Sequence, residues 1–211
     1  MTLSKEESYS EAAEEFLRLA DEFKGSDDDV VVGLQQQAID AYIKSGEYHK
    51  AIDLLIGMTA IRTDENAVYF LYSSAWGIAD SLMHSESKEM ELKNEYIAKN
   101  PSSHNSFVVR YNIIEKVSKD QERKYEAGDL LFTLHNDVRE KRIENKDYKV
   151  EDIYYDALNI YHDYPDREKV NELMLGFDKL YPNDPRANGL IELVAIYYDE
   201  QGRDKEFEDL A

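Results

Sequence analysis

Cysteine is absent from this chain of 211 residues. Disulfide bonds, thiolate metal sites and cysteine nucleophiles are therefore excluded. Proline and glycine are scarce, at 4 and 9 residues, which favours helices joined by short loops. No apolar run approaches the roughly 18 residues of a membrane-spanning helix. The N-terminal stretch is acidic and amphipathic, unlike a signal peptide, so we expect a cytoplasmic protein or an exported domain whose signal has been removed.

Cations are also few relative to acids. The chain has 25 Lys and Arg against 45 Asp and Glu, which gives a formal net charge of −20. Nucleic-acid binding requires clustered Lys and Arg, and anionic membrane surfaces repel such a chain, so neither is an expected partner. The simplest interpretation is an acidic, solvated surface, and the same charge permits a basic partner.

What the chain does have is apolar and aromatic surface. Hydrophobic residues make up 42% of it, enough for a packed core, and there are 16 Tyr. Tyrosine combines a large apolar ring with one hydroxyl that needs a hydrogen-bond partner. We therefore expect many tyrosines to be half-buried, between helices or on a binding surface.

Apolar residues recur at helical spacing along the whole chain, and no segment alternates as a strand would. We expect capping residues at Ser26 with Asp29, and at Asp184 with Pro185. More than about 60% helix and no sheet are predicted. The first helix is expected to end at Lys24 and Gly25, and the others to cover residues 30–44, 48–58, 65–83, 87–99, 104–119, 122–143, 150–163, 167–181 and 185–201, with a short last helix.

The helices repeat with a fixed period. Tyr42 and Trp76 are 34 residues apart (76 − 42), and so are Tyr164 and Tyr198 (198 − 164). A period of this length is typical of stacked helical hairpins, because one hairpin cannot bury its apolar stripe alone.

At these positions the chain resembles the tetratricopeptide-repeat family. The family pattern of a Tyr, a turn Gly, and an Ala and an aromatic in the second helix is matched by Tyr42, Gly46, Tyr48, Ala51 and Leu55. The C-terminal part offers Ala195, Tyr198, Gly202 and Phe207, although Phe207 stands where Ala is expected, and Thr63 stands where the closing Pro is usual. The resemblance covers residues 32–62 and 153–207 and is weak between them.

The resemblance implies an all-α fold: an α-solenoid of about five antiparallel helical hairpins. It implies one domain over residues 1–211 with an irregular middle at 85–145. It also implies a scaffold that binds another protein or peptide on its concave face. In that register the groove is lined by Gln36, Asp40, Phe70, Ser74, Leu158, His162, Glu192 and Ile196.

These groove residues mix acids with apolar groups, and none matches the Lys and Arg clamp that some family members use for a C-terminal carboxylate. They favour a basic or amphipathic peptide. Leu190, Val194, Tyr197 and Phe207 are expected to be only partly covered by the short last helix. Either the chain is a fragment of a longer solenoid, or this end contacts another chain, for example in a homodimer.

Motifs of known chemistry are absent from the sequence. It has no glycine-rich phosphate loop, zinc-protease motif or nucleophile elbow. The five histidines have no partner at a metal-ligand spacing on one helix face. We therefore expect neither an enzyme nor a bound metal or cofactor.

Two alternatives remain open. The first is a chaperone or assembly factor that holds an apolar segment of a secretion or cell-envelope partner. An exposed apolar patch at the C-terminal end would favour it. The second is a small-molecule sensor or an enzyme with a pocket near Trp76, which a closed cavity with convergent polar groups would favour.

Overall fold

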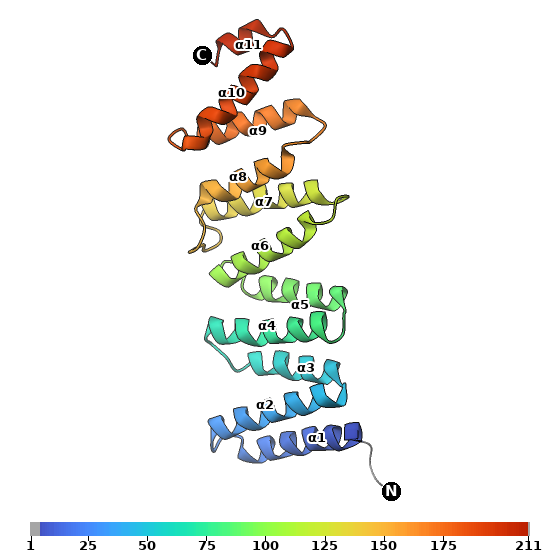
Figure 1. The fold of residues 1–211 in the computed structure, drawn as a ribbon. Coiled ribbons are helices and arrows are strands. Elements are labelled where there is room, and N and C mark those ends of the chain that lie inside the picture. The colour runs from blue at the N-terminus through green and yellow to red at the C-terminus, as the bar shows by residue number, and fades with distance from the viewer. Residues whose placement is uncertain (1–4, 211) are drawn as a thin grey trace. The chain divides into compact units, whose positions relative to one another are not determined.

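The computed structural model describes residues 5–210, and in them it contains 11 helices, no strands and 77% helix (Figure 1). The all-α prediction is confirmed. None of the described helices is long and apolar enough to cross a membrane. The helices are α1 (Lys5–Phe23), α2 (Asp28–Ser45), α3 (Tyr48–Thr59), α4 (Glu65–Ser81), α5 (Glu86–Lys99), α6 (His104–Ser118), α7 (Lys124–Arg139), α8 (Val150–Tyr161), α9 (Arg167–Leu180), α10 (Pro185–Glu200) and α11 (Asp204–Glu208).

The chain divides into two compact units. The first ends at Asn100 and the second begins at Pro101, within the break that the sequence predicts before α6. In each unit every helix packs against the next one along the chain. The single-domain organisation stays a prediction.

Side-chain caps start many of the helices, as the short polar residues between apolar stripes lead us to expect. Asp184 accepts a hydrogen bond from the backbone N–H of Arg186, and Pro185 follows it at the first helical position. At α2 the predicted cap was wrong. Asp27 caps the helix by accepting from Val30, whereas the Ser26 hydroxyl donates to the carbonyl of Phe23 at the end of α1.

The seventh helix is shorter than its predicted range of 122–143. Lys141 adopts a positive φ of 59°, and the N–H groups of Arg142 and Ile143 both turn back to the carbonyl of Asp137. This local hydrogen bonding reverses the chain after Arg139. Ile143 is thereby buried from a loop.

Small residues and aromatic rings fill the interior of each unit. In the first, Ala51 is fully buried, and Tyr72 and Tyr96 pack edge to face. In the second, a Cβ atom placed on Gly128 would lie 2.5 Å from the ring of the buried Tyr161. That ring can approach α7 because residue 128 has no side chain.

Candidate binding surfaces

The structure places most of the predicted groove residues on the surface, but in separate units. In the first unit Gln36 and Asp40 are exposed on α2. Phe70 is 65% exposed on α4, one turn from the half-buried Ser74, whose hydroxyl donates to the Phe70 carbonyl. Phe70 is therefore the one large apolar side chain of this set that the first unit offers to a partner.

In the second unit His162, Glu192 and Ile196 are exposed. Leu158 is not, because it retains only 3% of its accessible surface and belongs to the core that includes Tyr154 and Phe177. Its assignment as a groove residue was wrong. A hairpin register of 34 residues fixes the position of Leu158 along α8, but not which side of α8 the neighbouring helices cover.

The side of α10 that carries Ile196 is exposed along its full length. At 100° per residue, positions 185, 188, 189, 192, 193, 196, 199 and 200 share one side of the helix, and all are exposed. We call this side the α10 face. Ile196 and Leu193 are 55% and 46% exposed, and Glu192, Asp199 and Glu200 surround them.

The opposite side of α10 is core. Leu190 and Val194, which the sequence led us to expect only partly covered, are buried, and Tyr197 is half-buried. The exposed apolar residues are instead Leu193 and Ile196 on the α10 face and Phe207 on α11, which is 41% exposed. Leu193 was missed because no position of the repeat pattern selects it.

Contacts with α9 and with the start of α11 hold α10 in place. Glu168 accepts a hydrogen bond from the Tyr197 hydroxyl at 2.9 Å and pairs with the Arg203 guanidinium at 2.7 Å. That guanidinium also lies 4.4 Å from the centre of the Tyr198 ring. The α10 face is thus presented by a helix that is anchored from behind.

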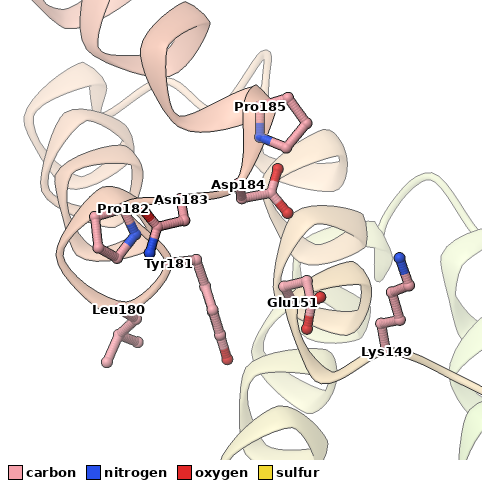
Figure 2. Close-up of a pocket in the computed structure, with 8 residues that line it drawn as sticks. All are labelled: Lys149, Glu151, Leu180, Tyr181, Pro182, Asn183, Asp184 and Pro185. Atoms are coloured by element: carbon pink, nitrogen blue, oxygen red, sulfur yellow. The ribbon is translucent and has the colours of Figure 1, made fainter.

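An open cleft lies at the N-terminal end of the α10 face (Figure 2). Its volume is about 440 Å³, and the residues that line it come from the start of α8 and the α9–α10 connection: Lys149, Glu151, Leu180, Tyr181, Pro182, Asn183, Asp184 and Pro185. Figure 2 shows the Tyr181 side chain between Leu180 and Glu151. Pro185 belongs to both the cleft and the α10 face, so the two surfaces are continuous.

Polar contacts fix the frame of the cleft. The Arg186 guanidinium pairs with Asp184 at 2.7 Å and with Asp152 of α8 at 2.8 Å, and it lowers the pKa of Asp184 to about 2. The Tyr181 hydroxyl lies 2.5 Å from Nε2 of the buried His135. Burial lowers the pKa of that imidazole, which stays neutral.

Trp76, near which a pocket was one alternative, is part of the packing between α4 and α5. Its ring makes edge contacts with Tyr69 and Tyr96 at centroid distances of 5.8 and 6.1 Å. The Lys93 ammonium lies 5.9 Å from the ring centre. Among residues 5–210, no group of three or more His, Asp or Glu side chains is placed to hold a metal ion.

Comparison with known proteins adds little to this description. No protein-family model and no curated protein matches the chain. Among solved structures the chain is similar to "BtubC (BKLC) from P. vanneervenii", with 15% sequence identity and a TM-score of 0.41, over 99% of this chain and 89% of that one. This similarity carries no argument about fold or function.

Proposed function

We propose that this protein is a protein-interaction module, a tetratricopeptide-like helical scaffold that binds a basic amphipathic peptide or protein segment. The observation that carries the proposal is the α10 face: two large aliphatic side chains exposed side by side and surrounded by carboxylates. The helix-to-next-helix packing in each unit supports the repeat part of the proposal. The α-solenoid of about five hairpins and the concave groove belong to the same proposal.

The physical case rests on apolar area and charge together. Removing an aliphatic side chain such as Ile196 or Leu193 from water contributes about 1.5–3 kcal/mol when burial is complete. Glu192, Asp199 and Glu200 add a negative rim, which attracts a cationic segment and fixes its orientation. An amphipathic helix with Leu on one side and Lys on the other would satisfy both features.

Fluorescence anisotropy tests this proposal. The probe is a labelled helical peptide of Leu and Lys with its Leu residues on one face, and its control is a scrambled peptide of the same composition. We expect the wild-type protein to prefer the amphipathic peptide, and Ile196→Glu to weaken that binding by about tenfold or more, the equivalent of one lost aliphatic contact plus a buried charge. Binding should weaken as salt rises.

Leu82→Glu is the matched control, because Leu82 is exposed in the first unit and the substitution changes the charge equally. If Ile196→Glu binds like the wild type, or if Leu82→Glu loses as much affinity, the α10 face is not the binding surface. Equal binding of both peptides would instead support the chaperone alternative, in which apolar segments are held without regard to their pattern.

A second candidate is self-association through the C-terminal end, which the exposed Phe207 and Leu193 favour. Two copies that each carry a charge of −20 repel one another, so a homodimer should strengthen as salt rises. Sedimentation velocity at low and high salt, with Phe207→Glu as the variant, separates this candidate from peptide binding. A monomer under all these conditions would exclude it.

A further inference from the structure

A second cavity lies in the first unit, where three helix ends meet. It has a volume of about 490 Å³, within the range of small-molecule pockets, which is roughly 300–1,000 Å³. The residues that line it come from the end of α1, the first turns of α2 and the end of α3: Ala20, Asp21, Lys24, Asp28, Val31, Val32, Gln35, Gly57, Met58, Ile61 and Arg62. We call it the three-helix cavity.

The wall of this cavity is mainly aliphatic. Val31 and Val32 are half-buried, Ala20 and Met58 are buried in the core, and Ile61 is 71% exposed. An isoleucine held in solvent beside a cavity is the kind of side chain that a bound apolar group would cover.

Gly57 indicates that this space is kept open. It lies inside α3, where alanine would stabilise the helix by about 1 kcal/mol. Its φ is not positive, so the backbone does not require glycine, and a Cβ atom placed on it would meet no atom within 4 Å. Neither conformation nor packing explains this glycine, whereas a side chain at position 57 would take up room in the cavity.

The charges around the cavity balance. Asp21 and Asp28 carry two negative charges, and Lys24 and Arg62 carry two positive ones. A ligand with a net charge of either sign therefore gains little at this rim, which favours an uncharged ligand.

One polar group of the wall lacks a partner. Oε1 of Gln35 is buried and accepts no hydrogen bond within the described part of the chain. Leaving such an acceptor without a donor costs free energy. A ligand N–H or O–H would supply the donor after a rotation of the amide about its last side-chain bond, which is a soft torsion.

From these observations we propose that the three-helix cavity binds a small uncharged aromatic molecule that carries one N–H or O–H group. The rings lie against Val31, Val32 and Met58, in the space that Gly57 leaves open. The donor group of the ligand reaches Gln35. This site is separate from the α10 face, and its occupation does not depend on the function proposed for that face.

The test is a fluorescence titration of the full chain with N-phenyl-1-naphthylamine, which is uncharged and has two aromatic groups and one N–H. We expect saturable binding by the wild type. Gly57→Leu should weaken it by about tenfold or more, because the added side chain fills the cavity. Gly57→Ala should give a smaller loss. Gly77→Leu is the matched control, since Gly77 also lies in a helix beside open space but does not line the cavity.

Two further comparisons examine the ligand class. 8-Anilinonaphthalene-1-sulfonate has the same rings and N–H but carries a negative charge, and we expect it to bind more weakly than the uncharged probe. Gln35→Leu should weaken the uncharged probe by about fivefold, the equivalent of one hydrogen bond. Urea unfolding of each variant shows whether a loss of binding comes from a loss of fold.

The proposal is overturned if the wild type shows no saturable binding, or if folded Gly57→Leu and Gly57→Ala bind like the wild type. Tighter binding of the sulfonate would overturn the assignment to an uncharged ligand. None of these results bears on Ile196→Glu and the peptide, so the two proposals fail independently.

Discussion

At position 135 a histidine ring is enclosed between helices of the second unit and retains 1% of its accessible surface. It packs edge-on against Tyr154 and Tyr181, and its Nε2 faces the Tyr181 hydroxyl. Burial lowers its pKa from 6.5, with Arg139 acting in the same direction. The sequence offered no sign of this, because a histidine near a helix end most often stays in solvent.

The free energy of unfolding should therefore depend on this residue at mildly acidic pH. Because the folded-state pKa is lowered, the unfolded state binds the proton first. Stability is full above the unfolded pKa of about 6.5 and is lost as the pH falls toward the folded value, by at most about 1.4 kcal/mol per pH unit. The measurement is urea unfolding of the wild type and His135→Gln between about pH 5 and 7.

Glutamine keeps a polar group that can face Tyr181 but does not titrate in this range. The variant should show a flatter pH profile than the wild type over the same interval. Parallel profiles would mean that His135 is protonated equally in the folded and unfolded states, contrary to its burial.

Within the helices, glycines occupy two opposite kinds of environment. Gly57 in α3 faces open space, whereas a Cβ on Gly128 in α7 would clash with Tyr161, whose ring is fully buried and anchored by its hydroxyl near Asp129. The same substitution should therefore have opposite effects at the two positions.

Gly57→Ala should stabilise the protein by up to about 1 kcal/mol, through helix propensity alone. Gly128→Ala should destabilise it by about 1–3 kcal/mol, because the buried ring cannot move away without disturbing the core. Chemical denaturation of both variants beside the wild type measures the two changes. A gain in stability at position 128 would mean that the approach of α7 and α8 is looser than described.

For the molecule as a whole, net charge dominates the electrostatics. Twenty uncompensated negative charges repel one another in the folded chain, and its ion pairs are mostly exposed, each worth about 0–1 kcal/mol. Salt screens both, but the repulsion acts over longer distances and involves more groups.

We therefore expect the urea midpoint to rise when sodium chloride is increased from low ionic strength to physiological levels and above. The effect should be smaller for a variant in which several exposed acids outside the ion pairs, such as Asp53 and Glu200, are replaced by their amides. A midpoint that falls with salt would show that the surface ion pairs outweigh the repulsion.

Local features of the sequence predicted the helices well. Apolar spacing located each of the helices, Asp184 with Pro185 marked the start of α10, and Gly46 ends α2 at a φ of 79°. The errors occur where the chain chooses between neighbouring local hydrogen bonds. Asp27 replaces Ser26 as a cap, and the turn after Arg139 ends α7 early.

The candidate surfaces were predicted less well, because exposure is a property of packing and not of one helix. Ile196 and Phe70 were predicted to be accessible, and they are. Leu158 occupies an equivalent position in the repeat and yet is buried, while the unselected Leu193 is exposed. The helical period states which residues share a side of a helix, but only its neighbours decide which side stays in solvent.

By itself, then, the sequence determined the class of this protein: all-α, acidic, without cysteine chemistry, with its helix ends set by short-range capping and backbone preferences. The tertiary structure alone decided the rest. It left the acidic α10 face uncovered, brought the ends of α1, α2 and α3 around an open cavity, and closed helices over His135. These features depend on contacts between segments far apart in the chain, and such contacts have no local signal from which they could be read.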